Sequence, residues 1–105
     1  MRVEKRRKLE NAGWRVGNAS EFLGLTEDES VFVEIKLALA RRLRQLREQN
    51  NWTQAEFAKR VGSSQSRVAK MEAADPTVSV DLLVRSLLAA GADRRDLGRV
   101  VASRK

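Results

Sequence analysis

The segment from Thr53 to Glu72 most constrains what this chain can fold into, because it carries the start and stop signals of two short helices. Thr53 precedes Glu56 by three positions, so the hydroxyl and the carboxylate can satisfy each other's free backbone amides in a capping box. Gly62 ends the first helix, because glycine enters the left-handed conformation at little cost. Ser64 then caps a second helix. The sequence therefore predicts two short helices joined by a tight turn.

The second of these helices has an apolar face and a polar face. Val68 and Met71 lie three positions apart and are expected to pack against apolar residues of the first helix. The opposite face is expected to be exposed and carries Gln65, Ser66, Ala69 and Lys70. A polar helix face of this kind can contact base edges, or it can simply keep the helix soluble.

These features resemble the lambda repressor and Cro type of helix-turn-helix, also called the XRE family. The resemblance covers about residues 35 to 90, with the helix-turn-helix at about 53–72. The positions that match the family pattern are Trp52, Thr53, Gln54, Ala58, Val61, Gly62, Ser64, Gln65, Ser66, Val68, Met71 and Glu72. The sequence departs from the pattern in two places: Ser63 stands where valine is frequent, and Ala73-Ala74 stands where Asn-Gly is frequent.

The resemblance implies that the chain binds double-stranded DNA through six residues. These are Gln54, Ser64, Gln65, Ser66, Arg67 and Lys70. In similar proteins the glutamine at the position of Gln54 contacts a phosphate and hydrogen-bonds the glutamine that begins the recognition helix, here Gln65. By its own chemistry Gln65 can pair bidentately with adenine, and Ser66 can bond several bases. Lys70 suits guanine or a phosphate, and Arg67 is expected on a phosphate first and on guanine second.

Two further positions are expected to have structural roles. The family equivalents of Arg47 and Glu72 form an ion pair that joins the first helix of the domain to the recognition helix, and Arg47 can also touch a phosphate. Trp52 replaces the usual leucine and is expected to act as a hydrophobic staple onto the next helix. Stacking of Trp52 on a base is the alternative.

The rest of the chain predicts an all-α fold, a five-helix repressor-like domain with an N-terminal helical extension. Thr26 and Glu29 form a second capping box, which begins a helix from Glu27 to about Gln49 with an apolar stripe at helical spacing. Two later helices are expected over about 80–90, ended by a glycine, and over about 94–102. The last of them can pack on its own domain or pair across a dimer axis. Arginines on the polar side of the long helix are expected to be solvated or to contact phosphate; they are Arg41, Arg42 and Arg44.

The sequence divides into an extension, residues 1–26, and the helix-turn-helix domain, residues 27–105. The extension holds a basic run, Lys5-Arg6-Arg7-Lys8, which is either a solvated tail or a nucleic-acid arm. A short helix is expected over about 19–23, ended by Gly24. An apolar cluster is expected to dock on spare apolar positions of the long helix, in its own chain or across a dimer; its members are Trp14, Val16, Phe22, Leu23 and Leu25.

Composition limits the possible chemistry. The 105 residues include no cysteine and no histidine, so no nucleophile-base constellation and no metal or cofactor site can be assembled, and we expect no enzyme activity. The formal charge of +7 favours a polyanionic partner. No stretch is apolar enough to span a membrane, so the cytoplasm is the expected location.

The expected function is that of a sequence-specific transcription regulator, a repressor that reads the major groove as a homodimer. One recognition helix contacts only a few base pairs, so useful specificity needs two copies on a palindromic operator. The main alternative is an antitoxin of the HigA type, which resembles this fold, represses its own operon and neutralises a small ribonuclease toxin. An RNA- or ribosome-associated adaptor is a further alternative.

Overall fold

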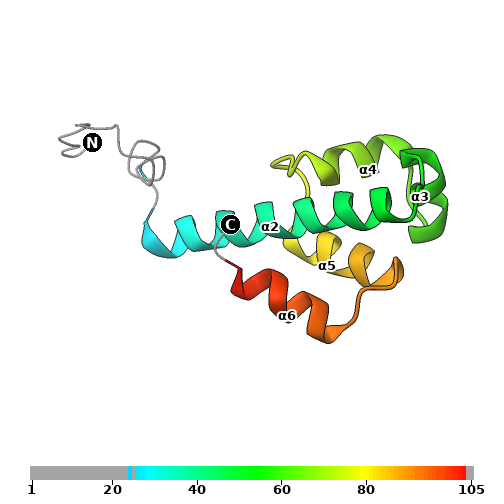
Figure 1. Cartoon of the computed structure of the whole chain (residues 1–105). Coiled ribbons are helices and arrows are strands. Elements are labelled where there is room, and N and C mark those ends of the chain that lie inside the picture. The colour runs from blue at the N-terminus through cyan, green and yellow to red at the C-terminus, as the bar shows by residue number, and fades with distance from the viewer. Residues whose placement is uncertain (1–23, 25, 104–105) are drawn as a thin grey trace. The chain divides into compact units, whose positions relative to one another are not determined.

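The computed structural model describes residue 24 and residues 26–103. These residues form helices and turns and no strand, which confirms the predicted all-α fold (Figure 1). The helices are α2 (Glu27–Gln49), α3 (Gln54–Val61), α4 (Gln65–Glu72), α5 (Val80–Ala89) and α6 (Arg94–Ala102). The chain divides into two units between Val33 and Glu34, so the first turns of α2 are described separately from the helical body that follows. No described helix is both long and apolar enough to cross a membrane.

Local capping signals set the start of α2. The Thr26 Oγ1 accepts a hydrogen bond from the Glu29 backbone N–H at 3.0 Å, and the Glu29 carboxylate accepts one from the Thr26 N–H at 2.9 Å. Acidic side chains in the first turn suit the positive end of the helix dipole. Both predicted ends of this helix are confirmed. The predicted basic run, the short helix over 19–23 and the apolar cluster from Trp14 to Leu25 lie outside the described residues.

Helices α2, α3, α4 and α5 each contribute buried side chains to the core of the helical body. Its fully buried large side chains are Leu39 and Leu43 of α2, Phe57 of α3, Val68 and Met71 of α4, and Leu83 and Leu87 of α5. Each such side chain contributes about 1.5–3 kcal/mol by leaving water. The packing of the α4 apolar residues against α3 is therefore as the sequence predicts.

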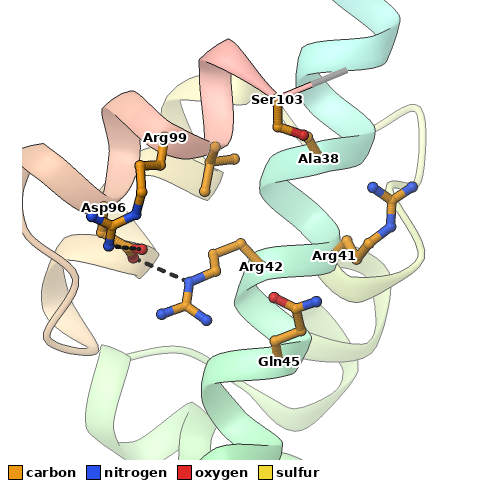
Figure 2. A pocket seen from close by; sticks show the side chains of 8 residues that line it. Ala38, Arg41, Arg42, Gln45, Asp96, Arg99 and Ser103 are labelled. Atoms are coloured by element: carbon orange, nitrogen blue, oxygen red, sulfur yellow. Dashed lines mark hydrogen bonds and ion pairs between the residues drawn. The ribbon is translucent and has the colours of Figure 1, made fainter. Parts of the chain in front are cut away.

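The last helix packs on its own domain. Leu97 and Val100 lie against the core, whereas Val101 is exposed. A buried carboxylate also ties α6 to α2: Asp96 accepts a hydrogen bond from Arg42 Nε at 3.1 Å and one from Arg99 at 3.4 Å (Figure 2). The expectation that Arg42 is simply solvated is therefore wrong, because α6 places an acidic partner beside it, and contact of Arg42 with phosphate stays a prediction. Arg44 instead pairs with Glu48 at the surface.

Candidate nucleic-acid interface

The N-terminus of α3 is fixed by its own capping residues. The Thr53 hydroxyl accepts a hydrogen bond from the Glu56 N–H at 3.0 Å, and the Glu56 carboxylate accepts one from the Thr53 N–H at 2.8 Å. Trp52 stacks on Phe57 with 5.8 Å between ring centroids, which is the predicted staple. The Arg60 guanidinium lies 4.3 Å from the Trp52 ring centroid, a cation–π contact that the sequence analysis missed. The Trp52 ring is thus engaged within the protein.

The turn after α3 has the predicted left-handed glycine. Gly62 has φ +69° and ψ +40°, and its N–H donates to the carbonyls of Ala58 and Lys59. The next N–H, that of Ser63, donates to the Ala58 carbonyl at 2.8 Å. These bonds close the last turn of α3, and three residues separate the end of α3 from the start of α4. The geometry is that of two short helices joined by a tight turn.

The second helix presents the polar face that the sequence predicts. Its cap, Ser64, accepts a hydrogen bond from the Arg67 N–H at 3.2 Å. The side chains that the sequence assigns to DNA contact on this helix are all exposed: Gln65, Ser66, Arg67 and Lys70. They stand opposite the buried Val68 and Met71. The helix is therefore anchored on one face and free to meet a ligand on the other.

The hydrogen-bond partner of Gln54 differs from the predicted one. The Gln54 carboxamide Nε2 donates to Glu72 Oε1 at 3.2 Å, and no hydrogen bond joins it to Gln65 within the described part of the chain. The expected Gln54–Gln65 bond is therefore wrong for this structure. A carboxylate is a stronger acceptor than a neutral carboxamide, which favours the partner that Gln54 has. The side chain remains partly exposed at the start of α3.

The ion pair between Arg47 and Glu72 is present and nearly buried. Arg47 Nε donates to Glu72 Oε2, and Nη2 donates to Oε1 at 3.1 Å, so the pair is bidentate. The two side chains are 15% and 7% exposed. The hydrogen bond to Glu72 raises the pKa of Arg47 above its ordinary value. The remaining Nη1 donates to the Trp52 carbonyl at 2.9 Å, so all three guanidinium nitrogens of Arg47 donate hydrogen bonds.

One carboxylate thus connects three parts of the interface. Glu72, at the end of α4, binds Arg47 of α2 and Gln54 at the start of α3. The bidentate pair fixes α4 on α2, because it sets orientation as well as distance. The bonds from Gln54 to Glu72 and from Arg47 to the Trp52 carbonyl connect the start of α3 to the same pair. Such an arrangement suits a rigid, extended ligand that meets both helices at once.

Comparison with known proteins agrees with this geometry. Residues 38–100, more than half of the chain, match the family model of a helix-turn-helix domain. No curated protein and no solved structure matches the chain. The matched segment runs from the middle of α2 into α6 and contains both helices of the candidate interface. The chain therefore belongs to a helix-turn-helix domain family, whose architecture serves DNA binding.

Proposed function

We propose that this protein is a sequence-specific regulator of the lambda repressor and Cro type, which binds double-stranded DNA with α4 as its recognition helix. The observation that carries the proposal is the position of Glu72, which holds Gln54 and α4 together while the polar face of α4 stays exposed. A helix anchored in this way can enter the major groove as a rigid body. In this proposal the DNA-binding domain is residues 27–105, and residues 1–26 are an extension.

The proposed contacts divide by chemistry. Gln65 pairs with adenine and Ser66 with a neighbouring base, because both stand in the first turn of α4, which is the part of a recognition helix that contacts base edges. The Gln54 carboxamide has two N–H groups, and one remains for a phosphate oxygen while the other donates to Glu72. Arg67 and the Ser64 hydroxyl also serve phosphates. Lys70, in the last turn, reaches a phosphate or guanine.

The protein acts as a homodimer and a repressor in this proposal. A single recognition helix contacts few base pairs, so two copies on a two-fold symmetric site give the specificity that regulation requires. Binding across a promoter then blocks transcription.

Selection of bound sequences from random duplex DNA tests the proposal. The full chain should enrich a palindrome with an adenine in each half-site, and Gln65→Ala should enrich the same palindrome with that position no longer specified. Glu48→Ala is a suitable control, because Glu48 is an exposed residue of α2 that pairs with Arg44. A pool that stays random, or an identical palindrome from the Gln65→Ala variant, would contradict base recognition by α4.

A further inference from the structure

A groove runs between α2 and α6, outside the proposed DNA interface. It has a volume of about 440 Å³, and both helices line it over about two turns, from Ala38 to Gln45 and from Asp96 to Ser103 (Figure 2). None of the six residues proposed to contact DNA lines it. In Figure 1, α6 lies below α2 and α4 lies above it. A ligand in this groove would not occupy the exposed face of α4.

The charges in the groove are unbalanced. Three arginines line it, Arg41, Arg42 and Arg99, against a single carboxylate, that of Asp96. Arg42 uses only its Nε on Asp96, and Arg99 uses one terminal nitrogen at 3.4 Å. Within the described residues the two terminal nitrogens of Arg42 have no hydrogen-bond partner, and Arg41 has none at all. Each guanidinium offers five N–H donors, so most donors in the groove are free.

The shared carboxylate also fixes the position of this positive charge. Asp96 is 8% exposed, and its two oxygens hold Arg42 and Arg99 (Figure 2). Arg41 stands on the outer rim of α2, where Figure 2 shows it pointing away from the ion pair. Ala38 and Val100 add apolar surface to the lining. Preorganised guanidinium groups beside apolar surface suit carboxylates carried on short aliphatic stems.

We infer that the groove between α2 and α6 binds an acidic segment of a partner protein, in which successive Glu or Asp carboxylates pair with Arg42, Arg99 and Arg41. The shape favours a peptide over a compact anion. Two helical turns correspond to about 10 Å, the length of about three residues of extended chain. Arg42 and Arg99 meet at Asp96, whereas Arg41 points away from them, so the positive charge is divided between two places. This activity is separate from DNA binding and does not depend on it.

Fluorescence anisotropy of labelled hexaglutamate with the full chain tests the inference, with hexaglutamine as the uncharged probe. Hexaglutamate should bind and hexaglutamine should not. Arg99→Gln and Arg41→Gln should each weaken binding at least about fivefold, because each removes one partner of a carboxylate. Two variants with the same loss of charge outside the groove serve as matched controls. Arg44→Gln alters an exposed arginine of α2, Lys70→Gln alters the proposed DNA face, and both should retain full peptide binding.

Several results would overturn the inference. Equal weakening by Arg44→Gln or Lys70→Gln would show non-specific attraction to a basic protein, and so would binding of hexaglutamine as tight as that of hexaglutamate. Displacement of the peptide by citrate at the same concentration would indicate a site for small anions. Melting temperatures of the variants within about 3 °C of the parent show that weakened binding does not come from unfolding. Titration with duplex DNA is measured separately, so failure of peptide binding leaves the proposed function intact, and the reverse also holds.

Discussion

Replacing Glu72 by alanine should lower the free energy of unfolding strongly, because two other side chains, Arg47 and Gln54, lose their partner. The change leaves Arg47, which is 15% exposed, without its bidentate partner, and it also removes the acceptor of Gln54. Removing one member of a buried ion pair costs about 3–5 kcal/mol, because the other charge stays buried. Arg47 keeps the Trp52 carbonyl and some contact with water, so we expect a loss of about 2–4 kcal/mol in the free energy of unfolding. For a domain of this size that corresponds to a fall in melting temperature of about 10–25 °C.

Urea and thermal unfolding followed by circular dichroism measure this effect. Glu48→Ala is the matched control, because Glu48 also pairs with an arginine at 3.0 Å, but both partners are more than half exposed. It should cost less than about 0.5 kcal/mol. The double variant Arg47→Ala with Glu72→Ala should be more stable than the sum of the two single changes predicts, by at least about 1 kcal/mol. Additive effects, or a Glu72→Ala variant as stable as Glu48→Ala, would refute the argument that the pair organises the interface.

Four other substitutions test separate parts of the structure. The Ser63 hydroxyl is buried with no hydrogen-bond partner in the described part of the chain, so Ser63→Ala should raise the free energy of unfolding by about 1 kcal/mol. Ser64→Ala removes a helix cap and should lower it by about 1 kcal/mol. Urea unfolding of both variants distinguishes the two serines. Asp75 accepts hydrogen bonds from Thr77 that lower the pKa of its carboxyl, so its stabilising contribution is present above the ordinary value of 3.8 and is lost as the pH falls below it. The stability difference between the parent and Thr77→Val should therefore shrink below pH 3.8, and a difference that stays constant with pH would exclude this linkage. Lys70→Gln should reduce the slope of log affinity against log salt by about 1 if Lys70 contacts phosphate, and should instead relax specificity at one guanine if it reads a base.

Local signals account for the part of the fold that the sequence predicts well. Both capping boxes join residues three positions apart, so a reader of the sequence can recognise them without knowing the tertiary structure. Gly62 and the Trp52 staple are equally local, and so are the ends of α2 and α6. The ion pair between Arg47 and Glu72 spans 25 positions and came from the family resemblance, because nothing local in the sequence indicates it.

Two of the contacts that sequence reasoning missed join residues that only the tertiary structure brings together. Arg42 and Asp96 are 54 positions apart, and the Lys36 ammonium that donates to the Asp75 carbonyl is 39 positions from it. The predicted Gln54–Gln65 bond was wrong because the competing acceptor, Glu72, lies seven positions beyond Gln65 and enters the site only when α4 packs on α2. The six residues assigned to DNA contact remain a prediction; five of them are exposed and Gln54 is partly exposed.

The bond from Gln54 to Glu72 also affects the entropy of ligand binding. A long polar side chain that is free in solution loses about 0.5–1.5 kcal/mol of conformational freedom when a ligand immobilises it. Gln54 has already lost much of this freedom on folding, because its carboxamide is tethered to a carboxylate that Arg47 itself holds. A ligand that meets the start of α3 therefore finds a donor that is already oriented. The penalty has been moved from the binding step to the folding step.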